Sequence, residues 1–194
     1  DILHQRAEMA FFPDVVSDEV IGLCAARAAQ EHGDARRALD LLRVSGELAE
    51  REGAEHVMVK HVNSAQENIE TDTMSECVKT LPSQSKIVLC SMLLMAASGQ
   101  KVFTSGSVIN VYREVASELD TEALSHRRVS DLINELNMLG IITTRVVSHG
   151  RHGRTTEIYF KSPTNDIRTV IMNDSRFQEC GILHPLLKSH EKGD

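Results

Sequence analysis

Hydrophobic side chains recur every three to four residues through the first part of the chain, which is the spacing of an amphipathic helix. The pattern predicts helices over 2–10, from Ser17 to Gly33, from Asp34 to Gly53 and over 59–70. Ser17 and Asp34 carry the short polar side chains that cap helix N-termini, and glycine commonly follows a last helical turn. The first part of the chain is therefore expected to form a small all-helical domain.

The periodicity changes in the second part of the chain. Three further helices are predicted over 83–98, 105–119 and 125–139. Over 141–147 and 155–160 the period falls to two and β-branched residues become frequent, which predicts two strands around a polar turn. Three helices followed by a β-hairpin form the winged variant of the helix-turn-helix. The predicted fold is thus mainly α, with a helical domain followed by a winged helix.

Residues 67–80 are polar and lack a strong period, so we place the domain boundary in this stretch, although part of it can be helical. The prediction is one domain over 1–72 and a second over 73–194. Lys79 and Lys86 flank the start of the first winged-helix helix. Both are expected on a solvated face, and contact with a nucleic-acid backbone is the alternative.

Charge is distributed unevenly along the chain. The net charge is −7, but residues 1–72 hold 7 Lys and Arg against 15 Asp and Glu, whereas residues 73–194 hold 14 against 13. Residues 124–161 carry six basic side chains, three acidic ones and three histidines. This asymmetry indicates a nucleic-acid partner for the second domain.

Other features of the sequence exclude several protein classes. No apolar run approaches the length that crosses a bilayer, and the first ten residues do not resemble a signal peptide. The four cysteines are far apart and contain no Cys-x-x-Cys pair, which argues against a disulfide framework or a zinc site. We therefore expect a cytoplasmic protein with no membrane partner.

The third predicted winged-helix helix is the candidate DNA-binding element. A winged helix places this helix in the major groove of a duplex. Its N-terminal end carries side chains that suit contacts with base edges and phosphates. The candidate residues are Ser125, His126, Arg127, Arg128 and Ser130.

The predicted hairpin turn supplies the second candidate cluster, Arg151, His152 and Arg154. Arginine in such a turn can contact phosphates or enter a narrow minor groove. A basic turn or helix face is by itself equally typical of a solvated surface, but the two clusters occupy the two positions that this architecture directs at DNA. His149 and His152 have the spacing of metal ligands, yet no third or fourth ligand lies near them, so no metal is expected.

A third candidate lies in the first domain, where Gly33, Asp34 and Arg36 open a helix. An arginine at this position can reach a phosphate on a neighbouring domain. From the residues alone, an ordinary ion pair between Arg36 and Asp40 on a solvated face is the default interpretation.

The stretch from Gly33 to Arg43, GDARRALDLLR, resembles the sensor-2 motif of AAA+ ATPases. The form is that of the archaeal origin-recognition and cell-division-control family of replication initiators. The rest of the first half is similar to that family's helical lid, and the second half to its winged-helix domain. The resemblance covers essentially the whole chain, and Arg36 matches the sensor-2 arginine.

The resemblance implies a three-domain initiator with an ATPase core, a lid and a winged helix. The phosphate-binding pattern Gly-x-x-x-x-Gly-Lys-Ser/Thr is not found in this sequence. We therefore expect a C-terminal part of the protein that is not itself an enzyme and holds no cofactor. In the intact protein ATP or ADP with magnesium is expected, and Arg36 would sense the γ-phosphate.

The function implied is binding of double-stranded origin DNA by an initiator that recruits or loads the replicative helicase. This part is expected to be monomeric. Two other functions remain open at the level of sequence. A winged-helix transcriptional regulator would form a dimer on a palindromic site, and a module that docks the helicase would bind DNA weakly and without sequence preference.

Overall fold

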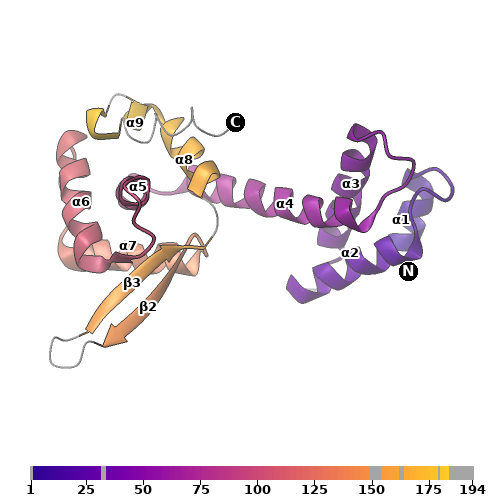
Figure 1. The fold of residues 1–194 in the computed structure, drawn as a ribbon, viewed down its shortest axis with the longest axis horizontal. Helices are drawn as coiled ribbons and strands as arrows, with labels where there is room; N and C mark the ends of the chain where they lie inside the picture. The colour runs from indigo at the N-terminus through magenta and orange to yellow at the C-terminus, as the bar shows by residue number, and fades with distance from the viewer. Residues whose placement is uncertain (1, 32–33, 149–153, 162–163, 179, 184–194) are drawn as a thin grey trace. The chain divides into compact units, whose positions relative to one another are not determined.

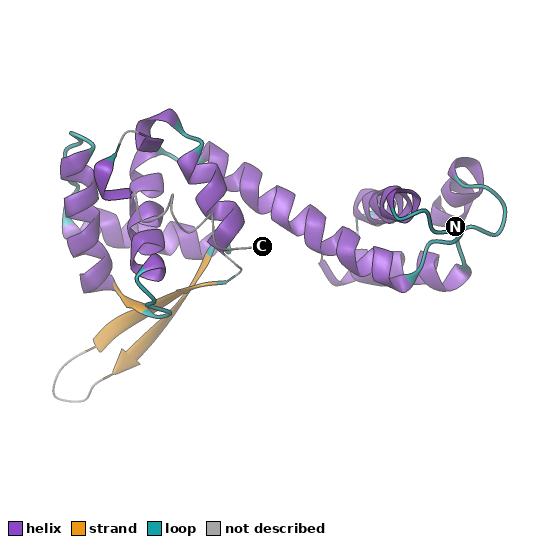
Figure 2. Cartoon of the chain, turned by 45° about the horizontal axis from the view of Figure 1, so that its top comes forward, coloured by secondary structure: helices purple, strands orange, loops and turns teal. Residues whose placement is uncertain are grey.

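The structure is a computed structural model that describes residues 2–31, 34–148, 154–161, 164–178 and 180–183. The chain divides into two compact units, Asp1–Thr73 (unit 1) and Met74–Asp194 (unit 2). Each unit has its own cluster of buried hydrophobic side chains. The prediction of a mainly helical chain is confirmed (Figure 2).

Unit 1 contains α1 (Ile2–Ala10), α2 (Asp18–Glu31), α3 (Ala35–Arg51) and the first part of α4 (Val59–Thr80) (Figure 1). All four helices contribute to its core, in which Cys24, Leu41 and Val62 are fully buried. Burial raises the pKa of the Cys24 thiol to about 11, because the thiolate would lose its hydration. Unit 1 is thus a small helical bundle with an aliphatic core.

Two of the predicted helix caps are confirmed in unit 1. The Ser17 hydroxyl accepts a hydrogen bond from the backbone N–H three residues later at 3.3 Å, and the Asp34 carboxylate accepts one from the Arg36 N–H at 2.9 Å. Gly53 follows α3 with a φ of +66°, a conformation that glycine adopts without strain. Gly33 lies outside the described residues.

The predicted end of the fourth helix at Glu70 is wrong, because α4 continues to Thr80. The stretch has a weak hydrophobic period, but it contains neither glycine nor proline to interrupt the backbone hydrogen bonds. The helix ends where Pro82 follows, since the residue before a proline is disfavoured in helical geometry. Polarity alone was therefore a poor signal for a helix boundary.

A buried histidine holds the turn between α3 and α4. His61 is 1% exposed, and its Nδ1 accepts a hydrogen bond from the Met58 N–H at 3.0 Å. Its Nε2 lies 3.2 Å from Glu52 Oε2, which also accepts a bond from Lys60 Nζ at 2.6 Å. The Lys60 ammonium, followed by His61, lowers the pKa of the Glu52 carboxyl. These contacts fix the conformation of the loop between the two helices.

Unit 2 has the order of elements of a winged helix. Helices and strands follow as α5 (Ser83–Ala97), β1 (Phe103–Thr104), α6 (Ser105–Glu118), α7 (His126–Met138), β2 (Ile142–Ser148), β3 (Arg154–Phe160), α8 (Thr164–Met172), α9 (Ser175–Gln178) and a 3₁₀ turn (Gly181–Leu183). The sheet has the order β1-β3-β2 and is antiparallel throughout. The predicted winged helix is confirmed, whereas β1 and the elements after β3 were not predicted.

Helix α5 lies at the centre of unit 2, packed against α6, α7 and α8. It is buried on almost every side, from Ile87 through Leu93. Such a helix needs no polar face, which explains its near-continuous apolar sequence. The three helices that surround it are placed by their contacts with this one segment.

Lys86 is 8% exposed and lies within α5, so the expectation of a solvated lysine was wrong. Its Nζ donates to Asp174 Oδ2 at 2.9 Å, and Arg176 Nη2 donates to the same oxygen at 2.8 Å. Arg176 also donates a short hydrogen bond to the Ser83 hydroxyl. Asp174, between α8 and α9, thus ties the α8–α9 segment to the first turn of α5.

The two cations hold the pKa of the Asp174 carboxyl far below its usual range, with the Arg176 hydrogen bonds as the larger cause. A carboxyl with a lowered folded-state pKa stabilises the fold at pH values above its ordinary pKa near 4. That contribution declines as the pH falls below this value, because protonation then costs more in the folded state.

We predict that Asp174→Asn lowers the free energy of unfolding by roughly 2 kcal/mol at pH 7, because the buried Lys86 ammonium loses its counter-charge. Urea unfolding followed by circular dichroism at pH 7 measures this loss. The variant should also lose less stability than the unmodified chain when the pH is lowered from 7 to 3. Glu114→Gln on the exposed side of α6 is the control, and an equal effect of the two substitutions would contradict the prediction.

Candidate nucleic-acid interface

The first turn of α7 is exposed because the opposite side of this helix is anchored in the core. The anchor consists of one apolar stripe at helical spacing, Val129, Leu132, Ile133 and Leu136, all buried. The Ser125 hydroxyl accepts a hydrogen bond from the Arg128 N–H at 3.4 Å and caps the helix, a role that the sequence analysis did not assign to it. The helix therefore presents its N-terminal residues to solvent.

The structure brings the predicted residues of this helix together on one exposed surface. Ser125, His126, Arg127 and Arg128 are all exposed. Ser130 is half-buried, and its hydroxyl donates to the His126 carbonyl at 3.0 Å. This leaves the Ser130 oxygen free to accept rather than donate a further hydrogen bond.

Arg128 is weakly paired before any ligand arrives. Its Nη1 lies 3.8 Å from Asp131 Oδ2, one helical turn further on, and both side chains are largely exposed. An exposed pair at this distance contributes little to stability, so Arg128 can exchange its partner at low cost. Asp131 nevertheless reduces the positive charge of the surface.

The turn that leads into α7 is held by a buried tyrosine. The Tyr112 hydroxyl donates to Gln84 Oε1 at 2.5 Å and accepts from the Leu124 N–H at 3.0 Å. The Tyr112 side chain is fully buried. One side chain of α6 therefore connects α5 with the residue that precedes the Ser125 cap.

Helix α7 and the β2–β3 hairpin, which we call the wing, are joined by close contacts. Gly140, with a φ of +72°, ends the helix, and the Ile141 N–H then donates to the Leu136 carbonyl at 3.1 Å. Asn137 Oδ1 accepts a hydrogen bond from the Thr144 N–H at 3.0 Å. The wing therefore starts from a fixed position on α7, and the β2–β3 hairpin extends away from the helices (Figure 1).

The register of the hairpin places Arg154 opposite Ser148, at the outer end of the described strands. Arg154 is exposed. The other two predicted residues of the wing, Arg151 and His152, lie outside the described residues. The described part of the wing thus contributes one of the three predicted side chains.

Arg145 is a basic residue that the sequence reasoning counted but did not single out. It is exposed on β2, opposite Glu157 of β3. The alternation of the strand was the available signal, because Ile142 and Thr144 point to the core side and Arg145 must then point outward. Glu157 is placed to offset part of its charge.

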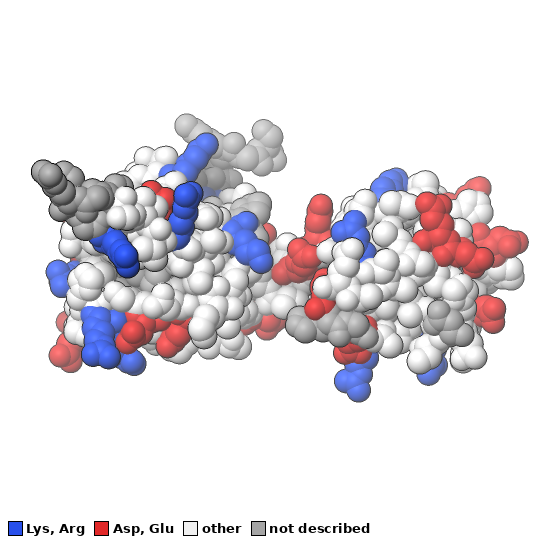
Figure 3. Space-filling view, turned by 90° about the horizontal axis from the view of Figure 1, so that it is seen from below, with Lys and Arg blue, Asp and Glu red and all other residues white. Residues whose placement is uncertain are grey.

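The net negative charge of the chain lies in unit 1, where acidic residues outnumber basic ones by about two to one. Figure 3 shows acidic side chains gathered over part of unit 1, whereas basic side chains are spread over unit 2. The exposed arginines of α7 and the wing belong to unit 2. The negative net charge of the whole chain therefore does not argue against contacts between these arginines and an anionic ligand.

Arg36 is exposed in the first turn of α3 and forms no ion pair with another described residue. Its neighbour Arg37 donates from Nε and Nη2 to the Glu31 carboxylate at 2.8 and 3.0 Å. Asp40, the partner expected by default for Arg36, lies instead 3.8 Å from Arg43. Of the two adjacent arginines, Arg36 is the one available to an external anion.

The described residues contain neither a cluster of metal ligands nor a membrane-spanning helix. Within the described part of the chain, no three His, Cys, Asp or Glu side chains are grouped as a metal site requires. His149 and His152 lie outside that part. None of the described helices has both the length and the hydropathy to cross a membrane.

Two family models match the sequence. Residues 1–67 match the Cdc6 AAA+ ATPase-type lid domain, and residues 76–170 match the CDC6 C-terminal winged helix domain. The two matches fall in units 1 and 2 and follow each other in the order that the helical bundle and the winged helix have here.

Curated relatives are similar over nearly the whole chain. The chain is 60% identical over 179 residues to an ORC1-type DNA replication protein of Methanoculleus marisnigri, which covers 92% of this chain and 42% of the relative. It is 55% identical over 193 residues to the protein of the same name from Pyrococcus abyssi, covering 100% and 45%. The chain thus spans less than half the length of these relatives.

A solved structure is similar as well. The Aeropyrum pernix ORC1 protein, determined in complex with DNA, superposes with a TM-score of 0.79 at 47% identity. The match covers 92% of this chain and 46% of that protein.

We predict that Tyr112→Phe lowers the free energy of unfolding by about 1–2 kcal/mol, because the part-buried Leu124 N–H loses its acceptor and Gln84 Oε1 loses its donor. Urea unfolding at pH 7 checks this. Tyr159→Phe, on the outward side of β3, is the matched control and should change the stability by less than about 0.5 kcal/mol. The prediction fails if the two substitutions cost the same.

Proposed function

Since this chain belongs to the Cdc6 family, with the lid domain of that family followed by its winged-helix domain, we propose that it binds duplex DNA at a replication origin. The observation that carries the proposal is the exposed basic first turn of α7, held by Asn137 in a fixed relation to the wing. A winged helix places these two elements in the major groove and against the adjacent backbone or minor groove. The similarity to an ORC1 protein determined with DNA supports it.

In this proposal α7 contributes sequence recognition. Arg127 and Arg128 donate to base edges or phosphates, and Arg128 exchanges Asp131 for the nucleic acid. Ser125 and His126 contact the backbone at the start of the helix. Ser130 accepts a hydrogen bond from a base amino group, because its own proton is committed to the His126 carbonyl.

The wing contributes sequence-independent affinity. Arg154 contacts a phosphate or enters the minor groove, together with Arg151 and His152 of the turn. Phosphate contacts position a protein on the duplex without distinguishing sequences. Removal of a wing arginine should therefore weaken binding to every duplex by a similar factor.

Arg36 is proposed to contact the γ-phosphate of a nucleotide bound by a protein of the relatives' full length. Its side chain fits this role because it is exposed and unpaired among the described residues, unlike Arg37. ATP with magnesium would supply a terminal phosphate whose loss on hydrolysis removes the contact. This chain would contribute the Arg36 guanidinium, from the first turn of α3, whose N-terminus is capped by the Asp34 carboxylate.

The whole protein is proposed to recruit or load the replicative helicase in the cytoplasm, with the present chain acting as a monomer. The relatives named ORC1-type DNA replication proteins support a role in replication. Binding to a single duplex site by one copy distinguishes this proposal from a dimeric transcriptional regulator.

The test is fluorescence anisotropy of the chain with origin duplexes and scrambled duplexes over a salt series. We expect tighter binding to origin DNA and a steep loss of affinity as salt rises, because phosphate contacts release counterions. Absence of binding to any duplex at low salt would contradict the proposal and favour a winged helix that docks a protein.

Single substitutions separate the two elements. Arg127→Ala should lower affinity for the origin more than for scrambled duplexes, by roughly 1–3 kcal/mol, whereas Arg154→Ala should lower both affinities and reduce the salt slope by about one.

Asp131→Asn should raise the affinity for DNA, because it removes the carboxylate that pairs with Arg128. Arg51→Ala, an exposed arginine of unit 1, is the charge-matched control. Equal effects of Arg51→Ala and Arg154→Ala would show that only net charge matters.

A further inference from the structure

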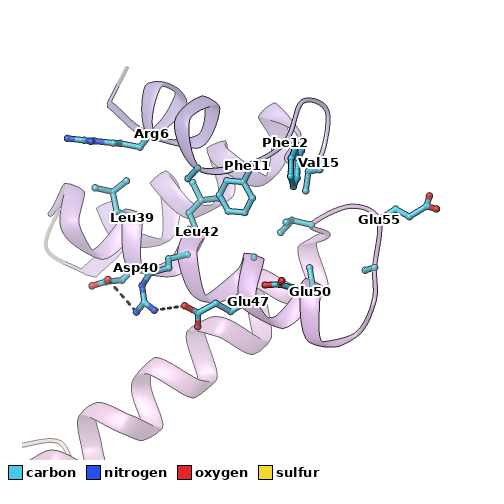
Figure 4. A pocket seen from close by; sticks show the side chains of 16 residues that line it. Arg6, Phe11, Phe12, Val15, Leu39, Asp40, Leu42, Glu47, Glu50 and Glu55 are labelled. Atoms are coloured by element: carbon cyan, nitrogen blue, oxygen red, sulfur yellow. Dashed lines mark hydrogen bonds and ion pairs between the residues drawn. The ribbon is translucent and has the colours of Figure 1, made fainter.

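Unit 1 carries an open groove with an apolar floor, which is not part of the surface of unit 2 that is proposed to bind DNA. Its volume is about 730 Å³, and it is lined by residues of α1, α3 and the two loops that follow these helices. Phe11, Leu39 and Leu42 form part of the floor (Figure 4), and Val57 also lines the groove. A groove of this size accommodates a few large apolar side chains.

The floor of the groove is preformed by close packing. Gly46 of α3 lies against the Phe11 ring, and a Cβ at this position would be only 2.5 Å from the ring, so the glycine is required for the approach. The Val57 N–H donates to the Val15 carbonyl at 2.9 Å and joins the two loops. The buried His61 holds the second loop from its other side. These contacts fix the groove before any partner binds.

Phe12 lies at the edge of this groove and is 84% exposed. An exposed aromatic ring beside an apolar depression is typical of a protein-binding surface, where such rings contribute much of the affinity. The ring makes no contribution to the buried core of unit 1. Burial in the core of unit 1 therefore does not account for its position.

Charges are arranged with opposite signs at the two ends of the groove. Arg6 lies at the Leu39 end and Glu55 at the other end, with Glu50 nearer the latter (Figure 4). Between them Arg43 lies 2.7 Å from Glu47 and 3.8 Å from Asp40, and this group of three keeps one excess negative charge. Arg6, Glu50 and Glu55 form no ion pair with any described residue, which leaves an unpaired cation at one end and two unpaired carboxylates at the other.

We propose that this groove docks an amphipathic segment of a partner protein, with large apolar side chains over the floor, Lys or Arg at the Glu50 and Glu55 end, and an acidic residue at the Arg6 end. The charge pattern selects this occupant. A purely apolar segment would leave three charges without partners at the rim, and an acidic segment would be repelled by the two glutamates. The inference concerns unit 1 and is independent of DNA binding.

The probes are two fluorescein-labelled 14-residue peptides with the same central Leu and Phe residues at helical spacing. One has Lys residues at one end and Glu at the other, and the second has Glu at both ends. By fluorescence anisotropy at low salt, the first peptide should bind at least about 10-fold more tightly than the second. Equal affinities would overturn the proposal.

Charge-exchange variants sharpen the test. In the double variant Glu50→Lys with Glu55→Lys, the peptide with two acidic ends should become the tighter ligand, and no change in preference would overturn the proposal.

Phe12→Ala should weaken peptide binding about 10-fold. Met9→Ala, which removes a side chain that is 77% exposed and outside the groove, should have no effect. Equal effects of these two substitutions would also overturn it.

Two further measurements identify other occupants. The charge-neutral variants Phe12→Ala and Met9→Ala should retain the DNA affinity of the unmodified chain, and the double variant should retain its helical circular dichroism. These controls distinguish loss of the groove from misfolding and from failure of the proposed function. Sedimentation of the free chain should show no dimer, and a dimer that Phe12→Ala dissociates would mean that a second copy fills the groove, contrary to the proposal.

Discussion

The burial of α5 is the constraint on which the winged helix depends. A helix that is apolar on nearly every side must be covered on every side, and α6, α7 and α8 provide that cover. Because α7 packs its apolar stripe against this core, its polar first turn has to face solvent. The exposure of Arg127 and Arg128 is thus a consequence of what α5 requires, and it is achieved without any strained backbone in α7.

The parts of the fold that the sequence predicted are those set by local patterns. The caps at Ser17 and Asp34 depend on a side chain and a backbone N–H two or three residues away, so a sequence reading can recognise them. The two main strands were found by their period of two. By contrast, β1 has only two residues and acquires its conformation from its pairing with β3, which no local pattern reveals.

The same distinction applies to the site. The basic turn of α7 was predicted because a single helix carries it. Contacts between distant segments were not, and these include the Tyr112 bonds to Gln84 and Leu124 and the pairing of Lys86 with Asp174. The choice of Arg43 over Arg36 as the neighbour of Asp40 depends on side-chain orientation, which spacing alone leaves open.

The direct connection between α7 and β2 has a consequence for the kind of duplex that unit 2 can bind. Gly140, Ile141 and the Asn137–Thr144 hydrogen bond leave almost no slack between the helix and the wing. The distance between a helix in one groove and a hairpin beside it is then fixed before a duplex binds. B-form DNA has a wide major groove that admits a helix, whereas A-form duplexes have a deep, narrow one that side chains cannot read. The short connection after α7 therefore sets the spacing between the helix and the described base of the hairpin, and a duplex that contacts both elements must match that spacing.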